Sequence, residues 1–544
     1  MKFALVQMNP TVGAVAENAG KIVQAAQEAA SSGAEVAVFP EQALCGYPPD
    51  DLVLRPGFMD AVETEEKKLA GALPGSLLAI VGAPLREGGK LYNAALLFHG
   101  GKRVAVARKM LLPNYGVFDE RRIFTPGTAP LVFKHRGVRL AVHICEDSWW
   151  PDSESFHGLR GGCDLLVNLS ASPYCRGRAN DREEMARKAT AALGVPLLYT
   201  NLVGGQDELV FDGGAMALAA SGQAVARSAL FREGQLAVDV LSKGGVWAPG
   251  RGQVAELPGP AEEVYEALKL GLKDYTEKNG FPGVIVALSG GIDSALVATI
   301  AVDALGKRRV FGVTLPSAVT SPETLADAQE LARRLGIPCL KIPIAPAVGA
   351  LQGMLDLAGL QTYWTPPRPG TLVEENVQAR VRGVVAMALS NRYGYMVVAT
   401  GNKSEMATGY ATLYGDMCGG FALLKDVPKT LVFELARWRN RRGEVIPPTT
   451  ISRPPSAELR PEQRDSDSLP PYDLLDPILE RYVERQEGLR DIVTAGYDEV
   501  TVRRVIRMVD CSEYKRRQGA PGVKITPRAF GRDRRMPITN GFRE

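Results

Sequence analysis

The sequence predicts an α/β protein of two domains, the second of which contains a doubly wound parallel sheet. Two observations carry this prediction. Short apolar runs alternate with helical patterns along the chain, and this alternation stops at 242–260, where glycine and proline are dense. We therefore expect a first domain at 1–245, a linker at 246–260 and a second domain at 261–544. The chain of 544 residues is long enough for two large domains.

The first domain is expected to combine strands and helices in layers. Residues 3–8 have the pattern of a strand, and residues 15–30 place apolar side chains at helical spacing. A further helix is expected at 181–193. The other strand-like runs lie at 36–39, 77–81, 94–98, 104–107, 140–144, 165–169 and 197–201.

The second domain has a stricter alternation of strand and helix, which is typical of a parallel sheet. Strands are expected at 284–288, 310–315, 340–344 and 395–400, and helices at 261–278, 293–305, 321–335 and 372–393. The stretches 343–370 and 447–472 break the pattern. They are expected to be either lids and binding loops or plain surface excursions.

Composition and charge argue against several classes of protein. The 64 basic and 61 acidic residues give a formal net charge of +3, which does not favour a dedicated nucleic-acid or membrane-surface protein. No apolar run reaches the roughly 18 residues of a spanning helix, and the first residues lack the pattern of a secretion signal. The seven cysteines include no Cys-x-x-Cys, which argues against a zinc ribbon or a disulfide framework. These features favour the cytoplasm.

A glycine-rich turn between a strand and a helix is the sharpest motif of the second domain. Residues 288–295 read LSGGIDSA. Glycines let the backbone approach an anion, and the free amides of a helix N-terminus favour phosphate. Ser289 and Ser294 can donate hydrogen bonds, and Asp293 can hold Mg²⁺. The alternative is an ordinary turn in which Ser294 or Asp293 only caps the helix.

This turn resembles the SGGxDS loop of the N-type ATP pyrophosphatases, which cleave ATP between the α and β phosphates. The resemblance implies a fold like that of the adenine nucleotide alpha hydrolases. It also implies that the loop binds ATP through Ser289, Gly290, Gly291, Ile292, Asp293, Ser294 and Ala295. Acceptors in that family include nucleotides, aspartate, tRNA bases and deamido-NAD, and the loop alone does not choose among them.

Further stretches of the second domain narrow the choice of acceptor. The stretches 374–392, 398–420, 425–430, 513–518 and 528–535 resemble the NAD synthetases. The resemblance implies that Thr400 binds ATP, that Asp293 and Glu405 bind Mg²⁺, and that Lys425 lies near the phosphates. It places Asn376, Glu405 and Lys515 at the deamido-NAD site. Taken alone, the basic cluster around Lys515 favours a solvated charge run. Contact of the basic tail, residues 503–543, with nucleic acid is a further alternative, to which we prefer the small-molecule interpretation.

Polar residues follow four strands of the first domain. Glu41, Lys109 and Cys145 each stand at a strand end, and Ser172 follows a fourth. A nearby lysine favours a thiolate, and a nearby glutamate can accept and return its proton, so this chemistry needs no histidine. Taken singly, each residue has a structural explanation, such as a cap, a surface ion pair or a small core side chain.

These segments resemble the nitrilase (carbon–nitrogen hydrolase) superfamily, whose fold is an αββα sandwich. The resemblance implies Glu41 as general base, Lys109 at the oxyanion and Cys145 as nucleophile, with Glu120 as a second glutamate. It implies that the amino-acid end of glutamine is held by Tyr115, Ser172 and Arg178.

The two resemblances together cover nearly the whole chain. A chain that combines both domains resembles the NAD synthetases that use glutamine. They imply ATP-dependent amidation of deamido-NAD with ammonia from L-glutamine, giving NAD, glutamate, AMP and pyrophosphate. The implied partners are these small molecules and further copies of the chain, associated through the second domain, rather than nucleic acid or a membrane. Two alternatives remain open: a glutamine-dependent amidotransferase that adenylates a different acceptor, and a non-catalytic binding protein with relic domains.

Overall fold

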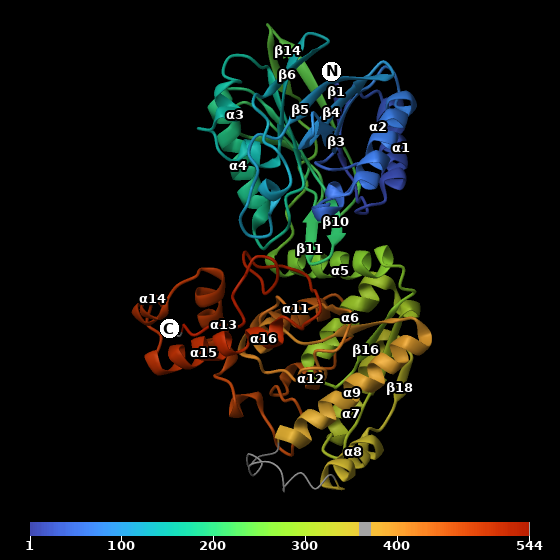
Figure 1. Cartoon of the computed structure of the whole chain (residues 1–544), viewed down its shortest axis with the longest axis vertical. Coiled ribbons are helices and arrows are strands. Elements are labelled where there is room, and N and C mark those ends of the chain that lie inside the picture. Colours follow the sequence, from blue (N-terminus) through green and yellow to red (C-terminus); the bar gives the residue numbers. More distant parts are fainter. Residues whose placement is uncertain (358–371, 543–544) are drawn as a thin grey trace. The chain divides into compact units, whose positions relative to one another are not determined.

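The chain folds into two units in the computed structural model, Met1–Pro260 and Ala261–Glu544 (Figure 1). The structure describes residues 1–357 and 372–542. None of the helices in these ranges is long and apolar enough to cross a membrane. The boundary between the units falls at the end of the glycine- and proline-rich stretch of the sequence.

The first unit contains two sheets, each with parallel and antiparallel pairs. The first has the strand order β15 (Val246–Pro249), β14 (Gly234–Lys243), β1 (Lys2–Gln7), β2 (Val36–Val38), β3 (Leu78–Glu87), β4 (Lys90–His99) and β5 (Lys102–Arg108). The second has the order β13 (Ala224–Arg227), β12 (Met216–Leu218), β9 (Leu197–Asn201), β8 (Leu165–Ser170), β7 (Val138–Ile144) and β6 (Leu131–His135). A separate hairpin joins β10 (Val203–Gln206) and β11 (Leu209–Asp212).

Four α-helices and three short 3₁₀ turns complete this unit. The helices are α1 (Val15–Ser31), α2 (Pro56–Ala72), α3 (Glu154–His157) and α4 (Arg178–Leu193). The turns are η1 (Asp50–Leu54), η2 (Glu120–Arg122) and η3 (Cys145–Ser148).

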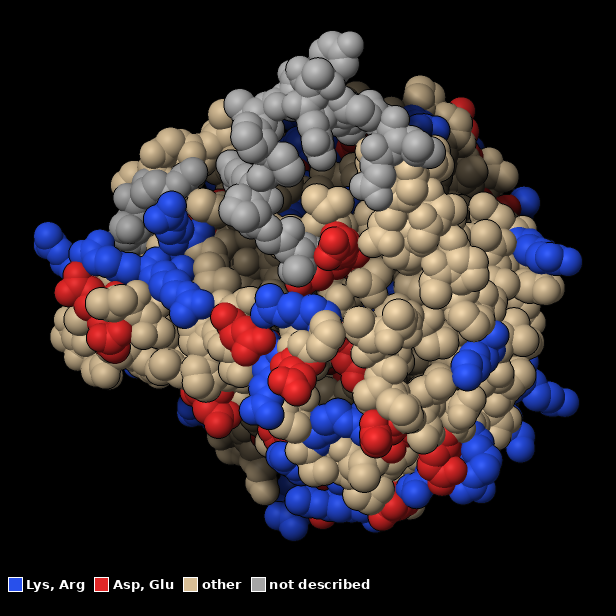
Figure 2. Space-filling model, turned by 90° about the horizontal axis from the view of Figure 1, so that it is seen from below, with Lys and Arg blue, Asp and Glu red and all other residues tan. Residues whose placement is uncertain are grey.

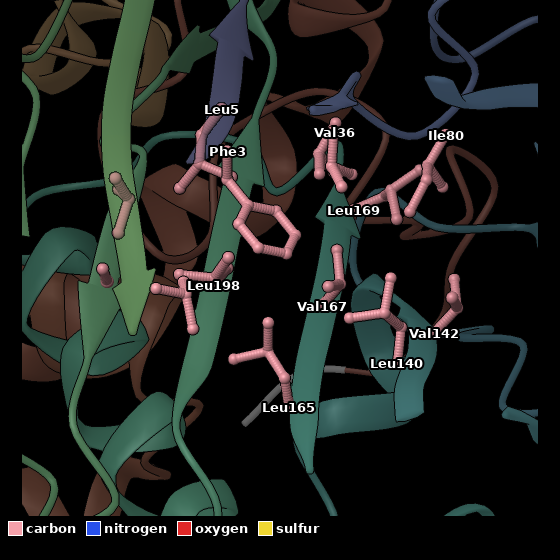
Figure 3. Close-up of a cluster of buried hydrophobic side chains, with 14 of the residues drawn as sticks. Phe3, Leu5, Val36, Ile80, Leu140, Val142, Leu165, Val167, Leu169 and Leu198 are labelled. Atoms are coloured by element: carbon pink, nitrogen blue, oxygen red, sulfur yellow. The ribbon is translucent and has the colours of Figure 1, made fainter. Parts of the chain in front are cut away.

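The two sheets pack face to face, because both contribute to one buried cluster. Figure 3 shows side chains of the first sheet opposite side chains of the second, namely Phe3, Leu5, Val36 and Ile80 opposite Leu140, Val142, Leu165, Val167, Leu169 and Leu198. The two-residue period of β1 places Phe3 and Leu5 between the sheets. Ala4 and Val6 face the other way and pack with α1 and α2, while Met185 of α4 packs outside the second sheet. The unit is an αββα sandwich, which confirms the expected fold.

The second unit is built on a parallel sheet of five strands. The order is β18 (Cys339–Lys341), β17 (Val310–Thr314), β16 (Val284–Ala287), β19 (Met396–Ala399) and β20 (Phe421–Ala422), and every neighbouring pair is parallel. The chain fills one side of β16 first and then the other, so the strand order reverses beside β16. Ligands of doubly wound sheets bind at the carboxyl ends of the strands at such a reversal.

Helices pack on this sheet and extend beyond it. The helix α6 packs against β16 and β17, and α9 packs against β16 and β19, where Val381 and Ala386 contact Ile285 and Val397. The helices are α5 (Pro260–Lys278), α6 (Ile292–Leu305), α7 (Pro322–Leu335), α8 (Ala345–Leu357), α9 (Leu372–Tyr393), α10 (Lys403–Thr408), α11 (Lys429–Asn440), α12 (Pro448–Ser452), α13 (Tyr472–Leu479), α14 (Leu489–Thr494), α15 (Glu499–Cys511) and α16 (Glu513–Arg516). Short turns occur at η4 (Lys307–Arg309), η6 (Asp465–Asp467) and η7 (Glu480–Glu484).

Two stretches differ from the expectation. Residues 246–249, expected as the start of the linker, form β15, which pairs antiparallel with β14 at the edge of the first sheet. The irregular stretch 343–370 contains α8, whose Pro346, Gly349 and Gly353 obscure the helical pattern in the sequence. The remainder, 358–370, lies outside the described residues.

Candidate active sites

The first unit brings Glu41, Lys109 and Glu120 into direct contact. The ammonium Nζ of Lys109 lies 2.7 Å from Glu41 Oε1 and 2.8 Å from Glu120 Oε1, and all three side chains are buried. Glu41 follows β2, and Lys109 follows β5. Glu41 and Lys109 therefore both stand at strand ends of the first sheet, and the fold brings their side chains together as an ion pair.

Cys145 joins this cluster from the other sheet. It follows β7 and opens the turn η3 with a backbone φ of +47°, a left-handed value that non-glycine residues rarely adopt. Burial raises the pKa of the Cys145 thiol, Glu41 raises it further, and Lys109 acts in the opposite direction. Burial lowers the pKa of Lys109, but the two glutamates more than offset this, so the lysine stays protonated. The cluster therefore places a thiol beside a permanent cation and two carboxylates.

The Cys145 turn is held by a carboxylate that the sequence analysis did not single out. Asp147 Oδ1 accepts hydrogen bonds from the amides of Met110 (3.0 Å) and Leu111 (2.8 Å), and its Oδ2 accepts one from Ile144 (3.1 Å). These bonds link the segment after Lys109 to the turn of the cysteine. Burial raises the pKa of Asp147 to about 7, although the three amides act to lower it.

A glycine permits the close approach of the Glu41 segment. A Cβ atom on Gly82 of β3 would lie 2.3 Å from the Pro40 carbonyl oxygen and 2.6 Å from Glu41 Cα. A side chain at this position would push the glutamate out of place. Glu41 Oε2 accepts a hydrogen bond from the Ala171 amide at 2.8 Å, which fixes the second carboxylate oxygen.

The three residues expected at the glutamine contact or adjoin the segments that carry the cluster. The hydroxyl of Tyr115 donates to Glu146, the residue after the cysteine, at 2.9 Å. Arg178 lies over the ring of Trp149, 4.5 Å from its centroid, and its charge reaches Tyr115. Ser172 is buried, and its backbone amide donates to Asn201 at 2.8 Å. Glu146 also accepts a hydrogen bond from Trp150 (2.9 Å) and was not predicted.

The second unit holds a cavity of about 270 Å³ at the carboxyl ends of β16, β17 and β19. The predicted ATP residues that line it are Ser289, Gly290, Gly291, Ile292, Asp293, Ser294 and Thr400. Ala295 lies behind them, buried in α6. Gly290 has φ +85°, and a Cβ there would lie 2.2 Å from the Thr324 carbonyl oxygen, so the loop requires glycine.

Two carboxylates meet a lysine in the wall of this cavity. Lys429 Nζ forms ion pairs with Asp293 and with Glu405 Oε1 (3.3 Å), and Asn402 donates to Asp293 Oδ1 at 3.0 Å. Burial raises the pKa of Glu405, while the charge of Lys429 acts to lower it. Lys425, expected near the phosphates, instead donates to the Ala520 carbonyl at 2.7 Å and is not among the cavity-lining residues. The lysine in the cavity is Lys429, four residues further along the same motif.

The expected deamido-NAD residues divide between two places. Glu405 lines the cavity, and Asn376 Oδ1 accepts from the hydroxyl of Thr412, a lining residue, at 2.8 Å. Lys515 donates to the carbonyls of Gly409 and Ala411, both at 2.7 Å. It lines a separate, open depression that also contains Arg503, Arg504 and Arg507. Lys515 therefore contacts the backbone of residues 409–411, the segment that leads to the lining residue Thr412, and is not itself in the cavity wall.

The irregular stretch 447–472 forms part of the cavity wall. Residues 453–459 and Asp465 line the cavity, and Glu458 accepts a hydrogen bond from the Thr324 hydroxyl at 2.6 Å. Of the two expectations for this stretch, a loop at the site is the one that fits.

The basic C-terminal segment is an ion-pair network. Glu513 pairs with Arg516 (2.8 Å), Arg517 (3.0 Å) and Arg534 (3.0 Å), and Lys524 pairs with Asp533 (3.1 Å). Figure 2 shows basic and acidic side chains interspersed on the face that it draws. These arginines therefore have a structural role within the fold.

Comparison with known proteins accounts for both units. Residues 2–245 match the carbon–nitrogen hydrolase family, and residues 264–519 match the NAD synthase family. A glutamine-dependent NAD(+) synthetase from Synechocystis sp. is 46% identical over 562 aligned positions, covering 99% of each chain. One from Thermotoga maritima is 43% identical, covering 100% of this chain and 99% of that one. A solved glutamine-dependent NAD+ synthetase from Acinetobacter baumannii, in complex with ADP, superposes with a TM-score of 0.78 at 39% identity, covering 99% of this chain and 98% of that chain. The chain belongs to the family of glutamine-dependent NAD(+) synthetases.

Proposed function

We propose that the protein converts deamido-NAD to NAD with ATP and with ammonia released from L-glutamine. The observation that carries the proposal is similarity along the whole chain to enzymes of this name, with 46% identity over both units. The proposal is further supported by the buried contact of Glu41, Lys109 and Glu120 and by the loop residues 289–294 that line the cavity of the second unit. A relic binding protein has no need to keep the buried ion pair of Glu41 and Lys109, which is costly without a function.

In the first unit, Glu41 takes the proton of the Cys145 thiol as the sulfur attacks the amide carbon of glutamine. The Lys109 ammonium stabilises the oxyanion, as a preorganised charge in a buried site does. Glu41 returns the proton to the leaving nitrogen, the C–N bond breaks, and ammonia and a thioester result. Water then attacks the thioester, with Glu41 again as the base, and glutamate leaves. Tyr115, Ser172 and Arg178 hold the amino-acid end of the substrate.

In the second unit, the carboxylate of deamido-NAD attacks the α-phosphorus of ATP, and pyrophosphate leaves. The loop 289–294 holds the phosphates, and Thr400 lies on the nucleotide. Ammonia attacks the acyl carbon, the bond to AMP breaks, and NAD forms as the nitrogen loses a proton. Asn376 and Glu405 bind deamido-NAD, and Lys515 contributes to that site by holding the segment 409–411.

Mg²⁺ fits this cavity, and Asp293 and Glu405 would hold it. Both carboxylates already converge on the cation of Lys429, and carboxylate oxygens are the ligands that Mg²⁺ prefers. When bound, the ion would neutralise part of the negative charge of the phosphates. No group of three or more possible metal-ligating side chains converges among the described residues, so phosphate and water oxygens would complete the shell.

We also propose that the enzyme works in the cytoplasm as a homo-oligomer associated through the second unit. All seven cysteines are free. Apolar side chains are exposed on α8 and α9, among them Met354, Leu355, Val384 and Met387. Light scattering on Val384→Asp tests the association, because a charge on this face lowers the oligomeric mass if the face is the interface.

The experiment that tests the function measures NAD formation with glutamine or with ammonium chloride as nitrogen donor. We expect Cys145→Ala to lose the glutamine-driven reaction and to keep the ammonium-driven one, because the second unit is untouched. Pyrophosphate release with other acceptors in place of deamido-NAD tests the alternative acceptor. No NAD from the wild-type enzyme under either condition contradicts the proposal.

A further inference from the structure

Asn93 is a buried amide that contacts both glutamates of the first site. It lies in β4 with no exposed surface, and its Nδ2 is 2.7 Å from Glu41 Oε1 and 3.5 Å from Glu120 Oε2. Its backbone carbonyl accepts a hydrogen bond from the Lys109 amide at 2.8 Å. Asn93 therefore touches the lysine's backbone and both carboxylates that the lysine's side chain joins.

The other end of this amide has no partner. Asn93 Oδ1 is buried without a hydrogen bond to any described residue. A buried acceptor without a partner is destabilising, and most buried polar groups avoid this state. Turning the amide over would place Oδ1 against the Glu41 carboxylate, so the carboxylates fix its orientation. The fold keeps a destabilising residue here, and among the described residues its side chain forms hydrogen bonds only through its NH₂ group, to the two glutamates.

The donor matters because of the charges around Glu41. The groups that face it are Lys109, Glu120 and the Cys145 thiol, and Tyr47 donates to Glu120 at 2.8 Å. One lysine thus serves two carboxylates in a buried space. Asn93 adds a second donor to the same Glu41 oxygen that Lys109 contacts, while the Ala171 amide holds the other oxygen.

We propose that Asn93 is a positioning residue of the glutaminase, which holds the Glu41 carboxylate in the orientation that takes the proton from Cys145. The inference rests on the proposed function of the first unit and adds to it a group that no motif indicates. Asn93 does not itself touch the reacting atoms. Its loss makes Glu41 a poorer base. This effect appears in the rate of glutamine hydrolysis and in the pH dependence of that rate.

The test compares Asn93→Leu with Asn18→Leu. Asn18 is also buried in the first unit, but its side chain bonds only to the backbone of Thr11 and Leu44. Glutamine hydrolysis is measured from pH 5 to 9, and ammonium-driven NAD formation is measured in parallel. Loss of a hydrogen bond to a charged group predicts a kcat for glutamine lowered about 10- to 100-fold in Asn93→Leu. We expect KM to change by less than about threefold, because Asn93 is not at the substrate-binding residues.

The pH profile separates positioning from packing. We expect the acid-side half-maximal rate of Asn93→Leu to move up by about one pH unit, because the ionised carboxylate has lost a donor. Asn18→Leu lowers stability but leaves the profile in place, and the ammonium-driven reaction stays near the wild-type rate in both. If leucine is not accommodated, the smaller pair Asn93→Ala and Asn18→Ala gives the same comparison.

An Asn93 variant with wild-type kcat, or with an unmoved acid limb, overturns the inference. So does a variant whose loss lies wholly in KM. A wild-type enzyme that does not hydrolyse glutamine contradicts the proposed function instead, and the two failures are therefore distinguishable.

Discussion

Replacing Lys109 by methionine is the perturbation whose consequence the structure defines best. Methionine has nearly the volume of the lysine stem, so the cavity term is small. What is lost is the ammonium between Glu41 Oε1 at 2.7 Å and Glu120 Oε1 at 2.8 Å, where all three side chains are buried. Removing one partner of a buried ion pair costs about 3–5 kcal/mol. That is a large part of the roughly 5–15 kcal/mol that stabilises a domain.

Hydrogen–deuterium exchange resolves this loss, because peptides from residues 1–260 report on the first unit alone. At pH 8 we expect their opening free energy to fall by about 3–5 kcal/mol. Burial already raises the pKa of Glu120, so in the variant this carboxyl takes up a proton more readily as the pH falls, and we expect a smaller loss at pH 5. Glutamine-driven synthesis disappears at both pH values.

Lys403 provides a matched control in the second unit. Its ammonium is buried between Asp426 (2.9 Å) and Glu484 (2.6 Å), so Lys403→Met makes the same chemical change away from the glutaminase site. We expect the loss of stability to appear in peptides from residues 261–544, with glutamine hydrolysis retained. A loss below about 1 kcal/mol in Lys109→Met, or one that grows as the pH falls, refutes the buried-ion-pair account.

Three further predictions concern a buried histidine and the cavity of the second unit. Burial lowers the pKa of His143 from 6.5 to about 4, so the unfolded chain binds its proton first, and the stability of the first unit falls as the pH drops from 6.5 to 4. The loss reaches about 3 kcal/mol, and acid titration of His143→Asn should show a flatter curve over that range. Asp293→Asn should abolish AMP formation while glutamine hydrolysis persists, because the carboxylate proposed for Mg²⁺ lies only in the second unit; full AMP formation counts against that role. Gly290→Ala should raise the KM for ATP at least tenfold, since the added Cβ meets the Thr324 carbonyl at 2.2 Å, and unchanged ATP kinetics would show that the loop tolerates a side chain.

The parts of the molecule that were predictable from the sequence are those with local signals. The two-residue period of β1 and the glycine-rich turn after β16 lie within single segments, so the fold class and the positions of Cys145 and Asp293 follow from short stretches. The comparisons confirm the family and the two-part architecture that those segments implied.

The missed residues depend on partners that are distant in the chain. Asn93 lies 52 positions from Glu41, and Lys429 lies 136 positions from Asp293. Nothing in either neighbourhood indicates which carboxylate the fold will bring near. The helix α8 and the strand β15 were missed for a different reason. Gly and Pro inside α8 and the proline at the end of β15 argue locally against a helix and a strand, and tertiary packing overrides these local signals.

The left-handed backbone at Cys145 has a consequence for protein engineering. A non-glycine residue with φ near +47° carries a strain on the order of 1–3 kcal/mol, and glycine relieves it. A search for stabilising substitutions guided by backbone conformation would therefore select glycine at position 145, at the sulfur on which the proposed glutaminase depends. Thermostabilised variants of this enzyme need an activity screen with glutamine as the nitrogen donor, because selection with ammonium would accept that change unnoticed.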